Sequence, residues 1–153
     1  MANEALIVID YTYDFVATDG KLTCGELGQA IEGKIVSLID EFVAANKVVL
    51  FANDMHIEND PYHPESKLFP PHNIEGTAGR ELYGAVKDVY EKYKSQVISF
   101  DKTRYSAFAG TNFIRNFVPG RKMISFFWIK SPWKAGLPEE NVRIFVMNTL
   151  ERF

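Results

Sequence analysis

Short apolar runs alternate with a helical pattern in the first part of the chain. Segments 5–9 and 47–52 are almost continuously apolar, as in strands that are buried on both faces. Between them, segment 25–45 carries apolar residues at three-to-four spacing, which predicts an amphipathic helix. This order of strand, helix and strand predicts two parallel strands joined by a right-handed crossover.

The pattern continues less regularly toward the second half. Segment 53–80 is rich in Pro, Asn, Asp and Gly, and a connection of this length is often functional. We expect a helix near 81–93 and a third strand at 96–100. Beyond residue 111 the pattern weakly favours a helix at 112–118 and strands at 123–129 and 141–147. The predicted fold class is α/β, with a mostly parallel, doubly wound sheet in three layers.

Three ionisable residues follow the predicted strands. Asp10, Asp54 and Lys102 stand where these strands end, and ligands bind at the carboxyl edge of open parallel sheets. Asp10 follows a wholly apolar run, so we expect it to be partly buried and to face Lys102 as an acid–base pair. The alternatives are a turn cap for Asp10 and a surface lysine for Lys102.

All three histidines lie in the loop after the second strand. His56, His63 and His72 span seventeen residues, and Asp54 precedes the first of them by two positions. Imidazole nitrogens and a carboxylate are suitable ligands for zinc, manganese or iron. We therefore predict a divalent metal site, and the alternative is a polar loop with solvated histidines. Metal affinity should fall as pH drops through the histidine range near ~6.5.

Composition and charge restrict the remaining possibilities. With 153 residues, 46% apolar and 24% charged, the chain has the size and composition of one globular domain. The net charge of −3 gives no reason to expect a nucleic-acid partner. However, residues 1–110 carry 10 basic and 17 acidic side chains, whereas residues 111–153 carry 7 and 3. We therefore divide the chain into an α/β domain at 1–112 and a divergent tail at 113–153, which packs on or extends that domain.

The same features indicate a location. A single cysteine, Cys24, is compatible with a reducing compartment. The first residues lack a basic region, and no apolar run reaches the roughly 18 residues needed to span a bilayer. We expect a cytoplasmic protein without a membrane partner.

Four motifs resemble one family. The segment Ala5 to Phe15 looks like the opening of the isochorismatase-like cysteine hydrolases. Within that superfamily, the Asp-Met-His of 54–56, the Phe-Pro-Pro-His of 69–72 and the lysine segment of 102–110 resemble the nicotinamidases, also called pyrazinamidases. The resemblance covers about residues 5–112, in the order and with the spacing of that family.

The resemblance implies an activity and a set of roles. Nicotinamidases hydrolyse nicotinamide to nicotinate and ammonia through a cysteine thioester, in pyridine nucleotide (NAD) salvage. Asp10 would be the general base and Lys102 would stabilise the thiolate, while Asp54 and the three histidines would hold the metal that orients the pyridine ring. Phe15, Phe69 and Tyr105 would contact the ring of the nicotinamide-like substrate, although core packing is an alternative for each.

The chain also departs from the family pattern. The family has its nucleophilic cysteine after the fourth strand, and no cysteine follows Cys24 here. Cys24 lies in the loop after strand one, where the family has no nucleophile. The alternative function is therefore an inactive, truncated or frame-shifted member that keeps the metal pocket. A sheet that is incomplete at the C-terminus would expose an apolar edge, so we also expect association into homo-oligomers.

Overall fold

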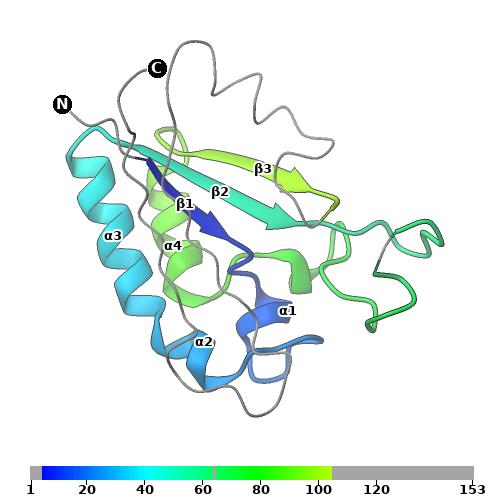
Figure 1. Cartoon of the computed structure of the whole chain (residues 1–153). Coiled ribbons are helices and arrows are strands. Elements are labelled where there is room, and N and C mark those ends of the chain that lie inside the picture. The colour runs from blue at the N-terminus through cyan, green and yellow to red at the C-terminus, as the bar shows by residue number, and fades with distance from the viewer. Residues whose placement is uncertain (1–4, 64, 105–153) are drawn as a thin grey trace, which may run out of the picture.

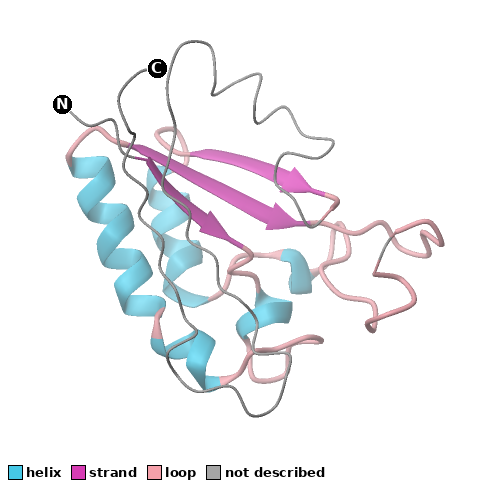
Figure 2. Ribbon diagram, in the orientation of Figure 1, coloured by secondary structure: helices cyan, strands magenta, loops and turns pink. Residues whose placement is uncertain are grey.

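The chain, seen here as a computed structural model that describes residues 5–63 and 65–104, is built on a parallel sheet (Figures 1 and 2). The strands are β1 (Ala5–Ile9), β2 (Val48–Asp54) and β3 (Ile98–Lys102), in the order β1-β2-β3. Both pairings are parallel, as the sequence predicts. The elements expected beyond residue 111, and the tail at 113–153, lie outside the described residues.

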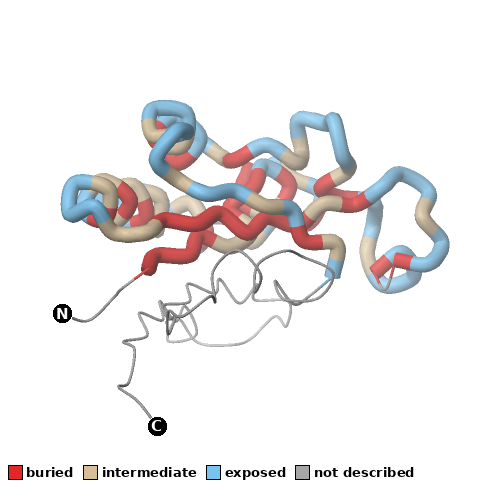
Figure 3. The backbone as a smooth tube through the Cα atoms, turned by 90° about the horizontal axis from the view of Figure 1, so that it is seen from above, coloured by how far each residue is buried: buried red, intermediate tan, exposed pale blue. Residues whose placement is uncertain are grey.

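Two helices cover one face of this sheet. In α3 (Glu32–Ala44) the buried residues are Ile35, Ile39 and Phe42, which recur every three or four positions along the helix. In α4 (Gly84–Tyr93) Val86 and Val89 are buried in the same way. These side chains form one apolar cluster with the β1 and β2 residues that point toward the helices (Leu6, Val8, Val49 and Phe51). Figure 3 shows this alternation of buried and exposed backbone along the helices.

The opposite face of the sheet has its own apolar cluster. Ala5, Ile7, Leu50 and Ala52 alternate with the helix-facing residues and are all buried. The near-continuous apolar runs of β1 and β2 therefore supply both faces. No described helix packs on this second face, so the predicted third layer is not among the described residues. None of the described helices is long and apolar enough to cross a membrane.

Two predicted helices have different bounds in the structure. The helix expected at 25–45 is divided at Ile31 into α2 (Glu26–Ala30) and α3. The helix expected from residue 81 begins at Gly84, because Leu82 forms an antiparallel bridge with Thr12. This bridge depends on contacts between distant segments, which helical periodicity does not report.

The strand β1 has the predicted bounds, whereas β2 and β3 begin and end later than predicted, and these later ends position the site. Asp54 and Lys102 are the last residues of β2 and β3, and they are register partners. Asp10 follows β1 directly, and its backbone N–H still donates to the Ala52 carbonyl at 3.2 Å. The short helix α1 (Tyr13–Val16) and the 3-10 helix η1 (Ala78–Arg80) also lie near this carboxyl edge (Figure 1).

Candidate active site and metal centre

An acid–amine pair joins the ends of the three strands. The Lys102 Nζ lies 2.8 Å from Asp10 Oδ2 and 3.4 Å from Asp54 Oδ1. Asp10 Oδ1 also accepts a hydrogen bond from the Asp54 backbone N–H at 2.7 Å. Asp10 has φ 57°, a left-handed conformation that aspartate adopts more readily than most residues and that turns its carboxylate toward the other two strand ends.

The pKa values in this pair are shifted by burial and by the neighbouring charges. Burial raises the pKa of Asp10, and the Lys102 ammonium opposes this effect only in part. Burial would lower the pKa of Lys102, but Asp10 and Asp54 outweigh it and raise that pKa. Lys102 is therefore a permanent cation at neutral pH, beside a carboxylate whose proton affinity is increased. This combination suits an acid–base couple.

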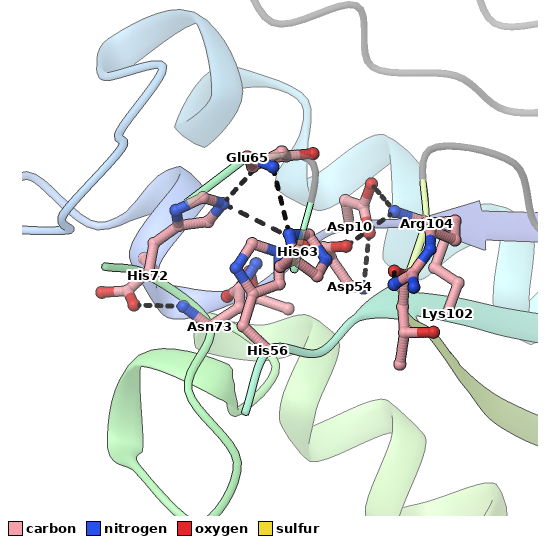
Figure 4. Close-up of polar contacts among 12 residues, drawn as sticks. Asp10, Asp54, His56, His63, Glu65, His72, Asn73, Lys102 and Arg104 are labelled. Atoms are coloured by element: carbon pink, nitrogen blue, oxygen red, sulfur yellow. Dashed lines mark hydrogen bonds and ion pairs between the residues drawn. The ribbon is translucent and has the colours of Figure 1, made fainter. Parts of the chain in front are cut away.

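A second group of ligand atoms lies beside this pair. Atoms of Asp54, His56, Glu65 and His72 lie within 4.8 Å of one another, and all four residues are buried (Figure 4). Asp54 Oδ2 is 2.8 Å from His56 Nε2 and 3.7 Å from His72 Nε2, and Glu65 Oε2 is 3.3 Å from His72 Nε2. Asp54 thus belongs to both groups, because its other carboxylate oxygen faces Lys102.

The chemistry of these atoms fits a divalent metal. Asp54 Oδ2, His56 Nε2 and His72 Nε2 are buried but make no hydrogen bond of normal geometry. Buried polar atoms are rarely left in this condition, and a shared cation would satisfy all three. The Nδ1 of His72 is 2.8 Å from the Pro70 carbonyl and donates to it, which leaves Nε2 free as a ligand.

His63 lies next to this group but is oriented differently. Its ring is 3.8 Å from the ring of His56, between centroids, and its Nδ1 accepts the Glu65 backbone N–H at 3.2 Å. A neutral imidazole that accepts at Nδ1 carries its proton on Nε2, and this Nε2 is buried with no hydrogen-bond partner among the described residues. Glu65 stands in the group where the sequence predicts His63, and His63 as a ligand stays a prediction.

The pKa values of His63 and His72 are shifted in opposite directions. Burial lowers the pKa of His63, and the nearby His56 lowers it further. Burial also acts to lower the pKa of His72, but Glu65, the Pro70 carbonyl and Asp54 outweigh it and raise that pKa. For Asp54, burial acts to raise the pKa, but His56 and Lys102 lower it overall. The charge of Asp54 is therefore kept, as a metal ligand requires.

Two of the three expected aromatic residues lie beside the metal group. The ring centroids of Phe15 and Phe69 are 5.3 and 6.3 Å from that of His72. A cavity of about 370 Å³ opens along the loop of residues 56–74, and Phe69 and the three histidines line part of it. Tyr105 lies outside the described residues. Phe15 does not line this cavity.

Some residues of the site were not found from the sequence. The sequence gives little reason to select Glu65 as a metal ligand, because it is one of several acids in a polar loop. Asp14 and Asn73 are buried beside the metal group and are hydrogen bonded to each other. Asp14 lies five residues beyond the expected strand end at residue 9, and no spacing rule connects it with Asn73, which is 59 positions away.

Cys24 does not have the surroundings of an activated nucleophile. It is half-buried, packs against the apolar cluster under the helices, and lies close to Gly28. Burial raises the pKa of its thiol, although two backbone hydrogen bonds oppose the shift. Catalytic cysteines have lowered pKa values, since the thiolate is the reactive form.

Comparisons with known proteins agree with this geometry. Residues 4–117 match the model of the isochorismatase domain family. The chain is 57% identical over 111 residues to the uncharacterized isochorismatase family protein PncA of Bacillus subtilis (strain 168), covering 71% of this chain and 61% of that protein. The chain therefore spans somewhat less than two thirds of the length of this relative.

Solved structures resemble this chain over a similar part. Pyrazinamidase/nicotinamidase from Streptococcus mutans UA159 has a TM-score of 0.70 and 50% identity, covering 73% of this chain and 65% of that one. The pyrazinamidase of Pyrococcus horikoshii, solved in complex with zinc, has a TM-score of 0.62 and 28% identity, covering 74% and 63%. The solved structures that the chain resembles thus include nicotinamidases/pyrazinamidases, and the chain itself belongs to the isochorismatase domain family.

Proposed function

We propose that this protein is a nicotinamidase-type amidohydrolase that converts nicotinamide, or a closely related amide, to the carboxylate and ammonia. The main support is the arrangement at the sheet edge, where Lys102 bridges Asp10 and Asp54 while Asp54 also faces His56 and His72. One carboxylate thereby joins an acid–base couple to a set of metal ligands. The product nicotinate would enter NAD salvage.

The reaction is a hydrolysis in which the C–N bond of the carboxamide breaks and a C–O bond to water oxygen forms. Asp10, with its raised pKa, takes the proton of the attacking group and returns it to the departing ammonia. Lys102 stabilises the negative charge that develops at the same edge. Phe15 and Phe69, whose rings both lie near that of His72, would contact the flat ring of the substrate.

A divalent metal completes the proposed site. Asp54, His56, His72 and Glu65 would hold it, with His63 as a further expected ligand, and zinc suits this mixture of nitrogen and oxygen donors best. When bound, the metal would act as a Lewis acid that orients the substrate ring. Manganese and iron are compatible with the same donors.

A second candidate function is favoured by the cysteine content. The family resemblance implies a thioester on a cysteine, and the only cysteine of this chain, Cys24, has a raised pKa and is half-buried against the apolar cluster. The alternative is a catalytically inactive member that binds metal and the amide without hydrolysing it.

One experiment separates these functions. The purified full chain is supplied with zinc or manganese, and ammonia release from nicotinamide is measured together with the bound metal. Hydrolysis predicts ammonia release that falls by about 10²–10⁴-fold in Asp10→Asn, since general acid–base catalysis contributes that much. No release, with about one equivalent of metal bound, supports the inactive member. Release that is lost in Cys24→Ala would make Cys24 the nucleophile, in spite of the raised pKa of its thiol.

A further inference from the structure

We propose that Asp14 is a positioning residue for the metal group, because its buried carboxylate holds the backbone of Asn73 and thereby orients His72 and His56. This inference rests on the proposed metal site. Asp14 is buried, but it belongs neither to the acid–base couple of Asp10 and Lys102 nor to the metal ligands.

Among residues 5–63 and 65–104, the carboxylate of Asp14 accepts hydrogen bonds only from main-chain amides. Its Oδ2 accepts the Asn73 N–H at 2.8 Å and its Oδ1 accepts the Lys21 N–H at 3.2 Å, and the residue is 6% exposed. A Cβ at Gly79 would lie 2.2 Å from Oδ2, so η1 closes over the carboxylate. Hydrogen bonds to an ionised acceptor are stronger than neutral ones, and this enclosure fixes their direction.

Asn73 is held from three sides. Its backbone is left-handed, with φ 46°, and the residue is completely buried. Besides the bond to Asp14, its Oδ1 accepts from the hydroxyl of Thr12 at 2.8 Å. Its carbonyl oxygen accepts the His56 N–H at 3.0 Å. Asn73 therefore connects the segment after β1 to the backbone of a predicted ligand.

This connection reaches two ligands at once. His72 directly precedes Asn73, and Ile74, which directly follows it, forms a parallel bridge with His56. The Glu75 N–H donates to the His56 carbonyl at 2.8 Å, so the bridge has hydrogen bonds on both sides of Ile74, one of them to the Asn73 carbonyl. The relative placement of the His56 and His72 rings thus depends on where Asn73 is fixed. Residues that orient the metal ligands without binding the metal themselves usually change metal affinity by 10–100-fold.

The test uses Asp14→Asn, which keeps the size of the side chain but replaces one acceptor oxygen with a donor amide. Co²⁺ serves as the probe, because its visible absorption reports ligand geometry, and competition with a chromophoric chelator gives its Kd. We expect Asp14→Asn to bind Co²⁺ about 10–100-fold more weakly, with an altered spectrum.

A matched control separates positioning from general destabilisation. Val16→Ala lies on the same short helix and removes a side chain that is 1% exposed in the apolar cluster. It should lower the free energy of unfolding but leave the Co²⁺ affinity and spectrum unchanged. If Asp14→Asn does not fold, Thr12→Val removes only the hydroxyl that holds Asn73, and we expect several-fold weaker binding.

The outcomes also distinguish this inference from the proposed function. If the wild-type chain does not bind about one equivalent of Co²⁺, the metal site itself is wrong and the inference is overturned with it. If wild type binds but Asp14→Asn, or Thr12→Val in its place, has the same affinity and spectrum, only the positioning task of Asp14 is overturned. A loss of equal size in Val16→Ala would also overturn it.

Discussion

The ammonium of Lys102 balances the negative charges of the Asp10 and Asp54 carboxylates at the strand ends. Its side chain is 6% exposed, and it lies between Asp10, whose side chain is 23% exposed, and Asp54. Without the ammonium, two carboxylates would face each other at a partly dehydrated edge. Removing one partner of a buried ion pair strongly destabilises the folded protein, because the other charge stays buried without a partner.

We predict that Lys102→Met lowers the free energy of unfolding of the metal-free protein by about 2–3 kcal/mol. This is below the ~3–5 kcal/mol typical of fully buried pairs, because water reaches Asp10. Urea unfolding at pH 7 gives the value. The double variant Asp10→Asn with Lys102→Met should recover part of the loss, and a single variant as stable as wild type would contradict the prediction.

The pH dependence of this difference follows from the raised pKa of Lys102. A lysine with a higher pKa in the folded state contributes its full stability below the unfolded value of 10.5, and loses it as pH rises through the folded value. The stability difference between wild type and Lys102→Met should therefore stay constant from pH 7 to about 10 and shrink above that. A difference that shrinks already between pH 7 and 9 would show that the pKa of Lys102 is not raised.

At the scale of elements, α3 and α4 are joined by a cap between distant parts of the chain. Glu32, the first residue of α3, accepts the Ala85 N–H at 2.8 Å through its Oε1. Tyr83, the N-cap residue of α4, makes no side-chain hydrogen bond to this end of the helix. The first N–H groups of a helix have no partner within it, and Glu32 supplies one.

We predict that Glu32→Ala lowers the free energy of unfolding by about 1 kcal/mol, the usual cost of losing an N-terminal cap. Glu32→Gln should lose much less, because its amide oxygen still accepts. Glu41→Ala is the matched control, since Glu41 is exposed on the same helix. Equal effects at both positions, measured by urea unfolding, would mean that the cap contributes nothing.

For the whole molecule, the metal group connects the sheet to the long loop. Asp54 is the last residue of β2, whereas Glu65 and His72 come from the loop of residues 55–77, which contains no described helix or strand longer than a bridge. A cation shared by these residues would tie the loop to the sheet edge. It would bind only the folded chain, because the unfolded chain does not bring the ligands together.

We therefore predict that zinc raises the Tm of the purified protein, and that a chelator reverses the rise. At a hundred times the Kd, the gain is about 2.7 kcal/mol, or roughly 5–10 °C for a domain of this size. Calcium, which prefers a larger all-oxygen shell, should have little effect. The double variant His56→Ala with His72→Ala is the control, and an equal zinc shift in it would place the metal elsewhere. Association into homo-oligomers stays a prediction, to be measured by light scattering.

The sequence alone determined the features that depend on local pattern. Continuous apolar runs predicted β1 and β2 as parallel strands, because a strand buried on both faces has no polar side to alternate. Because such strands share one carboxyl edge, the sequence also predicts that Asp10, Asp54 and Lys102 lie together, as they do in the structure.

Only the tertiary structure decided which atoms of the loop complete the site. Glu65 and His63 are two residues apart in the same polar segment, and the direction of each side chain depends on a backbone turn that no periodicity encodes. Asp14 reaches Asn73, and Glu32 reaches Ala85, across more than fifty positions of sequence. Such contacts are set by how the packed sheet and helices place distant backbone, and a one-dimensional pattern carries no information about them.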